Sequence, residues 1–394
     1  MKYPFSPEVL DALPEELAEL FRSLETTLLE EICSRLKVAG ELNQVTLQDI
    51  KALRALGVDV KAIEKAISTA TGTAQEKLEE LINDVVARNQ SYYEEVIDLA
   101  KLTKPERLVN ENDIEAIRRQ TKAEFVNLTQ SMGFIVTQGA KKVKLEPAKA
   151  YQWALDKAEA QIQSGAISYS EAIKSAVKEL AESGIKTVSW ESGHVDQVDV
   201  SVRRAVMTGI NQICQRYSEQ SAEYLETDLV EISAHQGARD TGEGPANHKS
   251  WQGRVYQWRE KAKAVNPAYK GFTETTGYGT GEGLGGWNCR HHFTPFVEGV
   301  MERTYSDEDL EKIDPPPFEY QGKTYTAYEA TQQQRKIERT IRKLKREQAA
   351  YKAAAAAPEY AAVTARMRRL QKQYKSFSAA AKLPMQSERT KILY

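Results

Sequence analysis

Cysteine is scarce in this chain of 394 residues, and long apolar runs are missing from it. The three cysteines, Cys33, Cys214 and Cys289, are far apart and odd in number, which argues against a disulfide framework. No stretch approaches the roughly 20 consecutive apolar residues of a membrane-spanning helix, and the first residues lack the apolar core of a signal peptide. We therefore expect a protein that folds in the cytoplasm, or in something assembled there, without a membrane partner.

Signatures of catalysis are missing as well. The sequence contains no G-x-x-x-x-G-K-[ST], no G-x-S-x-G and no H-E-x-x-H. Residues 281–286 satisfy G-x-G-x-x-G by letter, but a dinucleotide site needs a helix after this motif, whereas a strand-like segment follows here. We favour tight turning and close backbone approach as the role of these glycines over phosphate binding, and we expect no enzymatic turnover.

The charges of the chain are nearly balanced in number but unevenly placed. The sequence holds 54 Lys and Arg against 56 Asp and Glu. Residues 331–394 alone hold 16 basic and 4 acidic residues, so the first 330 residues are acidic as a whole. This asymmetry is the first hint about the function of the C-terminal part.

Helical periodicity dominates the first 226 residues. Apolar residues recur at steps of three and four from Leu17 to Ile32, as one buried face of a helix requires. The same criterion predicts a helix at 46–70 that is interrupted at Gly57. Further helices are predicted at 73–103, 112–131, 147–164, 170–183 and 198–225.

The pattern changes near Asp228. Apolar and polar residues alternate in 229–233 and 254–258, and 291–296 is a third strand candidate. Seven of the sixteen residues 271–286 are glycine, which prevents a long regular element there, and a hairpin is expected around Gln321-Gly322. We predict a mainly α fold in three parts: a helical region at 1–195, a compact α+β domain with a small sheet at 196–325, and a basic helical C-terminal arm at 326–394.

The C-terminal arm is expected to form two basic helices separated near Pro358. Lysine and arginine neutralise phosphates and release counterions, which gives salt-sensitive binding without sequence preference. A solvated helix and a helix docked on an acidic protein are the alternatives. The residues predicted to contact DNA or a partner are Arg335, Lys336, Arg339, Arg342, Lys343, Lys345, Arg346, Arg366, Arg368, Arg369, Lys372 and Lys375.

Four of the five histidines and one cysteine fall within residues 235–292. A deprotonable cysteine with several imidazoles is the ligand set that zinc prefers, and the ligands would be Cys289 and His248 with one or two of His235, His291 and His292. Adjacent residues of a strand point to opposite faces, so His291 and His292 rarely serve one ion. The retained set is His235, His248, Cys289 and His291. Hydrogen bonding without a metal, a closed structural zinc site and a catalytic zinc site all remain open.

The loop after the first strand carries an arginine beside an aspartate. Such a pair usually fixes irregular backbone through hydrogen bonds, and phosphate binding or catalysis are its alternatives. The residues expected to maintain the α+β domain are Arg239, Asp240, Trp251, Gly253, Trp287, Asn288 and Arg290.

Two runs in this region resemble a known family. Residues 231–253, EISAHQGARDTGEGPANHKSWQG, and 276–291, TGYGTGEGLGGWNCRH, resemble the phage minor capsid protein 2 family, a relative of the phage Mu protein F-like (MuF) head proteins. The segment 325–339 resembles the continuation of that family. In MuF-like relatives a closing Asn-Cys-Arg-Cys or Asn-Cys-Arg-His suggests zinc, and the matching positions here are His248, Cys289 and His291. Gly285 and Pro245 stand where relatives have cysteine, which weakens the zinc case.

The resemblance implies a MuF-like domain in a structural head protein of a tailed bacteriophage. Such a protein is present in few copies near the portal vertex and the head interior, and it acts in head assembly, DNA packaging or genome delivery. The implied partners are the portal protein, the major capsid protein and packaged double-stranded DNA, and the implied locations are the virion and, during assembly, the host cytoplasm. The alternatives are a virion-packaged metal-dependent enzyme, such as a nuclease or a toxin-like transferase, and a plain DNA-binding module.

Overall fold

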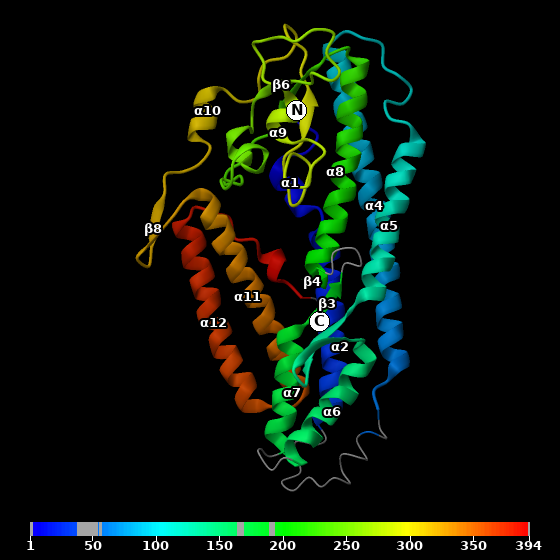
Figure 1. The fold of residues 1–394 in the computed structure, drawn as a ribbon, viewed down its shortest axis with the longest axis vertical. Coiled ribbons are helices and arrows are strands. Elements are labelled where there is room, and N and C mark those ends of the chain that lie inside the picture. Colours follow the sequence, from blue (N-terminus) through cyan, green and yellow to red (C-terminus); the bar gives the residue numbers. More distant parts are fainter. Residues whose placement is uncertain (1–2, 38–53, 55–56, 164–168, 189–193, 393–394) are drawn as a thin grey trace. The chain divides into compact units, whose positions relative to one another are not determined.

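The computed structural model describes residues 3–37, 54, 57–163, 169–188 and 194–392, which Figure 1 shows as a coloured ribbon. They fall into two compact units, each assembled from segments that are far apart in the sequence. The three-part division expected from the sequence stays a prediction. Unit 1 comprises Met1–Pro14, Glu76–Glu124 and Arg203–Gln333, and unit 2 comprises Glu15–Gln75, Phe125–Val202 and Gln334–Tyr394.

Helices make up most of the described chain, which confirms the mainly α prediction. The helices predicted at 112–131, 147–164, 170–183 and 198–225 are found within one residue of those bounds. None of the helices in the described part is long and apolar enough to span a membrane. The long helices are α2 (Glu15–Lys37), α4 (Val60–Leu99), α5 (Glu111–Ser131), α6 (Pro147–Gln163), α7 (Tyr169–Ser183), α8 (Val198–Tyr224), α11 (Ala327–Ala353) and α12 (Ala357–Ala380); the short ones are α1 (Pro7–Ala12), α9 (Phe272–Thr276), α10 (Asp307–Lys312) and the 3₁₀ turns Gly244–Ala246, His248–Ser250 and Ser387–Thr390.

The predicted boundary between helices near residues 70–73 is wrong, because α4 runs through it without a break. Gly72 lies inside this helix, where glycine costs about 1 kcal/mol relative to alanine. Ala70 and Ala74 on either side of it are buried, so packing of the continuous apolar face outweighs that cost. The helix predicted at 46–70 begins before α4, and most of the part before Val60 lies outside the described residues. Gly57, where an interruption was predicted, has a left-handed φ of +59°.

Unit 2 contains a sheet that the helical prediction for its region missed. Four antiparallel strands, in the order β2-β1-β3-β4, occupy segments between the predicted helices. The turn between β1 and β2 contains Gly139 at a φ of +61°, which allows the tight reversal. The strands are β1 (Gly133–Gln138), β2 (Lys141–Leu145), β3 (Ile185–Val188) and β4 (Val195–Gln197).

Helices α11 and α12, orange and red in Figure 1, form an antiparallel pair in unit 2. Tyr374 Oη donates a hydrogen bond to Glu338 Oε1 at 2.8 Å, and Gln348 Nε2 donates one to Thr364 Oγ1 at 2.7 Å. The chain turns between them at Ala355, which has a left-handed φ of +54°. The predicted break before Pro358 is therefore confirmed.

Unit 1 contains the strands predicted after Asp228. β5 (Leu229–Ile232) lies between β6 (Val255–Gln257) and β7 (Phe293–Pro295) in an antiparallel sheet, and β8 (Phe318–Tyr320) pairs with β9 (Lys323–Tyr325) in the expected hairpin. The core beside the three-stranded sheet is aromatic: Trp258, Phe272 and Phe293 pack with ring centroids 4.9–5.7 Å apart. This core positions the loops that carry the histidines.

Candidate metal centre

The sheet register brings the two histidine-bearing loops together. β5 and β7 pair so that Ile232 lies opposite Phe293. Just beyond this pair, the Ser233 N–H donates to the His292 carbonyl at 2.9 Å, and the His292 N–H donates to Ser233 Oγ at 3.1 Å. The loop that leaves β5 therefore begins beside the loop that enters β7, although about 60 residues separate them in the chain.

Three of the four predicted metal ligands converge. One ligand atom from each of His248, Cys289 and His291 lies within 4.8 Å of the other two, and all three residues are buried. The Cys289 Sγ is 3.7 Å from His291 Nδ1. His235, the fourth predicted ligand, stacks its ring on that of His291 with centroids 4.5 Å apart.

Carbonyl oxygens fix which imidazole nitrogens carry protons. Gln252 Oε1 accepts the backbone N–H of His235 at 3.0 Å, so it is also the acceptor for His291 Nε2 at 3.1 Å. His248 Nε2 lies 2.8 Å from the Glu282 carbonyl and therefore donates to it. In both rings the proton sits on Nε2, which leaves the Nδ1 lone pair available to a metal.

The donor set fits a zinc ion. Zinc–sulfur and zinc–nitrogen bonds of about 2.3 and 2.0 Å at tetrahedral angles separate the two ligand atoms by about 3.5 Å, close to the 3.7 Å between Cys289 Sγ and His291 Nδ1. Both histidines also have the carbonyl partner on the far nitrogen that metal-bound imidazoles usually have. His235 Nδ1 is 2.9 Å from the Gln236 carbonyl, and His235 is not among the residues whose ligand atoms converge.

Burial keeps the cluster in an uncharged, ligand-ready form. It lowers the pKa of His235 to about 3 and that of His248 to about 4, in both cases together with nearby arginines, and it lowers the pKa of His291 well below the usual value. Burial also raises the pKa of the Cys289 thiol. The imidazoles are therefore neutral at neutral pH, and a bound zinc ion would stabilise the thiolate.

His292 belongs to the core rather than to the cluster. Its ring meets the Tyr3 ring edge-on at 4.9 Å, and within the described structure neither ring nitrogen has a hydrogen-bond partner. Burial lowers the pKa of His292 to about 3, so the ring stays neutral. His291 and His292 therefore have different surroundings, as expected for adjacent residues of an extended segment.

The predicted Arg239 and Asp240 hold loops in place. Arg239 donates to the carbonyls of Glu282 at 3.2 Å and Trp287 at 2.9 Å, so it fixes the segment whose Glu282 carbonyl also bonds His248. Asp240 accepts from Lys249 Nζ at 3.2 Å, next to His248 in the chain. These contacts favour the structural interpretation of the pair.

Of the other motif residues, Trp251 packs directly against the centre. Trp251 is fully buried, with its ring 4.6 Å from that of His248 and 5.0 Å from that of His291, and its Nε1 donates to the Pro245 carbonyl. Gly253 has a φ of +70°, and a Cβ there would lie 2.3 Å from Leu310. Asn288 also adopts a left-handed φ of +56°, Arg290 lies 3.7 Å from Asp11, and the Trp287 side chain is 64% exposed.

The glycine-rich segment is compact because backbone lies directly against backbone. A Cβ on Gly283 would lie 2.2 Å from the Gly277 carbonyl, and one on Gly286 would lie 2.3 Å from the Gly281 carbonyl. No helix follows this segment, since β7 comes next. The glycines thus allow close approach, as the sequence indicated, and the G-x-G-x-x-G letters do not form a dinucleotide fold.

Comparison with known proteins identifies the family. The family model described as phage minor capsid protein 2 matches residues 5–379 of the 394. The chain belongs to the phage minor capsid protein 2 family. It is therefore a structural phage protein, and its place is the virion. Neither a search of curated proteins nor a search of solved structures gave a match.

The basic residues of this minor capsid protein divide into internal and exposed sets. Arg346 is buried and lies 3.3 Å from Glu25, Arg342 lies 3.1 Å from Asp199, and Lys345 donates to the Thr390 carbonyl. Lys343 pairs with Glu182 and Arg366 with Glu347, while Arg335 is partly buried. The exposed members of the predicted set are Lys336, Arg339, Arg366, Arg368, Arg369, Lys372 and Lys375.

Sequence reasoning missed two residues that support the centre, Gln252 and Asn211. Gln252 bridges His235 and His291 through one oxygen, a role that its position beside Trp251 does not reveal. Asn211 on α8 donates to the Cys289 carbonyl at 3.4 Å. Polar residues inside a helical apolar pattern are the available signal, but only the fold shows which loop such a residue meets.

Proposed function

We propose that this minor capsid protein is an internal head component at the portal vertex, where it acts in head assembly, DNA packaging or genome delivery and contacts packaged duplex DNA. The proposed protein partners are the portal protein and the major capsid protein. Family membership supports a place in the particle. The observation that carries the DNA contact is an exposed row of basic side chains on α12.

The DNA-contacting surface that we propose consists of Arg368, Arg369, Lys372 and Lys375, called here the α12 basic face. At 100° per residue these four positions fall on one side of the helix, opposite the buried Val363 and the buried Tyr374 and Phe377. All four are exposed, and no ion pair is found for them among the described residues. The single acidic residue of α12, Glu359, pairs with Lys174 instead.

Repulsion between the like charges of the α12 basic face destabilises the helix. A functional role in binding an anion would explain why these charges are placed together. Like charges three or four positions apart destabilise a helix by about 0.2–0.5 kcal/mol a pair, and Lys372 has such neighbours on both sides. Each phosphate contact releases counterions and adds about 0.9 to the salt slope of duplex binding. A helix with one acid-free face is therefore better suited to a polyanion than to water alone.

The charges of the two units also agree with this proposal, because unit 2 is basic and unit 1 is acidic. Unit 2, which contains α12, has 31 Lys and Arg against 23 Asp and Glu, whereas unit 1 has 23 against 33. We propose that unit 2 faces DNA and that the acidic unit 1 docks on protein. In this proposal the His–Cys cluster holds a structural zinc ion that stabilises the loops of unit 1.

The location is tested with DNA-filled particles that have been treated with DNase and protease. We expect the protein to be protected and to be present near portal stoichiometry by quantitative mass spectrometry. Its absence from particles, with free protein left in the lysate, would overturn the internal location.

The DNA contact is tested by changing Arg368, Arg369, Lys372 and Lys375 to glutamine in the full-length protein. We expect weaker duplex binding and a salt slope smaller by about 3 to 4. The matched control changes four exposed lysines of the same unit, Lys141, Lys142, Lys144 and Lys149, to glutamine. An equal loss in both variants would show that only net charge matters and would contradict the proposed face.

A further inference from the structure

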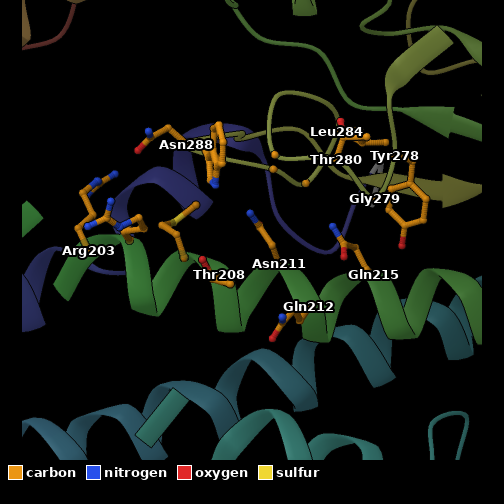
Figure 2. A pocket seen from close by; sticks show the side chains of 16 residues that line it. Arg203, Thr208, Asn211, Gln212, Gln215, Tyr278, Gly279, Thr280, Leu284 and Asn288 are labelled. Atoms are coloured by element: carbon orange, nitrogen blue, oxygen red, sulfur yellow. The ribbon is translucent and has the colours of Figure 1, made fainter. Parts of the chain in front are cut away.

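A pocket in unit 1, separate from the ligand atoms of the metal centre, has the chemistry of a nucleotide-binding site. It has a volume of about 430 Å³ and lies between one side of α8 and the glycine-rich segment 277–288. Figure 2 shows Arg203 and Asn288 at one end of it, and Gln215 and Tyr278 at the other. Side chains of α8 therefore form one wall and the loop forms the opposite one.

The lining of the pocket is suited to an anion. None of its sixteen lining residues is acidic, and Arg203 and Arg204 are both among them. The nearby carboxylate of Asp11 is shared, because both Arg203 and Arg290 form ion pairs with it. Asp11 therefore holds Arg203 at this end of the pocket, next to Arg204 in the chain.

Trp287 gives the pocket an exposed aromatic surface held in a fixed place. Its side chain is 64% exposed, which is unusual for so large an apolar group. Its ring lies against Gly281, where a Cβ would come within 2.7 Å of two ring atoms. Its backbone N–H donates to the Gly281 carbonyl and its carbonyl accepts from Arg239, so both sides of the residue are anchored.

Backbone hydrogen bonds within the loop hold its wall of the pocket in place. The Leu284 N–H donates to the Thr276 carbonyl at 2.9 Å, and the Gly286 N–H donates to the Gly283 carbonyl at 3.1 Å. A Cβ on Gly285 would lie 1.8 Å from the Gln215 amide on the opposite wall. A preformed wall lowers the entropic cost of binding a small ligand.

We propose that this pocket binds a nucleotide, with the base stacked on Trp287 and the phosphate near Arg203 and Arg204. The amide side chains of Asn211, Gln212, Gln215 and Asn288 can recognise base edges, because each offers both a donor and an acceptor. The nucleotide is either free or the terminal residue of a single strand, since both present the same base and phosphate. This inference is independent of the DNA contact proposed for α12.

The test measures binding of a deoxynucleoside monophosphate, inorganic phosphate and a 5′-phosphorylated single-stranded trinucleotide to the full-length protein by calorimetry. We expect saturable binding of the two nucleotide probes. Trp287→Ala should weaken it about 10-fold, within the range for one base stacked on an aromatic side chain, and Trp287→Phe should restore most of it. Arg204→Gln should weaken phosphate and nucleotide alike, because the charge is lost in both cases.

Matched controls separate this site from other effects. Val265→Ala removes an exposed apolar side chain of the same unit outside the pocket and should leave binding unchanged. The variant of the α12 basic face should bind the monophosphate as the wild type does. The test of nucleotide binding in the pocket is therefore independent of the test of DNA contact by α12. Tighter binding of the trinucleotide identifies a strand end as the ligand, and equal binding identifies a free nucleotide. No saturable binding at about 10 mM, or an unchanged affinity in Trp287→Ala, would overturn the proposal.

Discussion

Arg346 and Glu25, which are 321 positions apart in the chain, form a buried ion pair in unit 2. Arg346 Nη1 lies 3.3 Å from Glu25 Oε2, and the two side chains are 7% and 4% exposed. The other oxygen of Glu25 accepts the backbone N–H of Ile185 at 2.6 Å, so the pair also holds the start of β3. A residue that the sequence offered as a DNA contact is thus part of the core of unit 2.

Arg346→Met should destabilise the protein strongly. The substitution leaves the Glu25 carboxylate buried without its partner, which costs about 3–5 kcal/mol of unfolding free energy. Lys336→Gln on the same helix is the control, because Lys336 is exposed and its replacement should cost less than about 1 kcal/mol. Urea unfolding measures both values. Similar losses in the two variants would contradict the structural role given to Arg346.

Glu179 should make the stability of unit 2 depend on acid pH. Burial raises the pKa of this carboxyl, but hydrogen bonds from the Lys157 ammonium and the Thr137 N–H outweigh burial and lower it overall. A pKa that is lower in the folded state gives stability that is present above the unfolded-state value of about 4.3 and is lost as the pH falls through the folded-state value.

Glu179→Gln should therefore cost about 1 kcal/mol at pH 7 and less at pH 3, because the wild-type carboxyl loses its charge as the pH falls through its folded-state pKa. Denaturant unfolding of the variant and the wild type at both pH values measures the difference. A cost that stays the same at pH 3 would show that the charge of Glu179 is not the cause.

Zinc removal should loosen unit 1. If His248, Cys289 and His291 hold a structural ion, a chelator should lower the melting temperature and Cys289→Ser should reduce the zinc content measured by atomic spectroscopy. Cys33→Ser is the control, because Cys33 is equally buried but belongs to unit 2. Wild-type protein purified without zinc and unaffected by chelators would contradict the metal proposal.

His248→Ala separates the structural role from a catalytic one. A structural site predicts loss of the folded state of unit 1, because the neighbouring loops lose the bond to the Glu282 carbonyl as well as the metal. A catalytic site predicts a retained fold with loss of an assayable activity. Near-ultraviolet circular dichroism, which reports on the tryptophans packed in unit 1, distinguishes the two results.

Two helical glycines should respond in opposite ways to alanine. Gly72 in α4 has open space where a Cβ would be, so Gly72→Ala should stabilise the protein by about 0.5–1 kcal/mol. Gly209 in α8 has Thr121 Oγ1 at 2.4 Å from that position, so Gly209→Ala should destabilise it by about 1–3 kcal/mol. Thermal melting of both variants measures the signs, and stabilisation by Gly209→Ala would contradict the close packing of α8 on α5.

Local patterns in the sequence were enough for most elements. The helices at 112–131 and 198–225 and the strand at 229–233 follow from periodicity, because burial of one face imposes a repeat of 3.6 or 2 residues on each segment. The strand pairs at 133–145 were missed because each strand is short and lies between long helical patterns. The His–Cys cluster was identified by residue type, since few side chains can bind a soft metal.

The sequence by itself determined the helical character, the family motifs and the set of residues available for a metal or for DNA. Only the tertiary structure decided which of them act together. The register of β5 with β7 brought the loop after β5 beside the segment that carries Cys289 and His291, and contacts with α2 and α7 buried Arg346 while Arg368 stayed exposed. The physical reason is that ligand geometry and burial depend on contacts between residues tens to hundreds of positions apart, which no local pattern records.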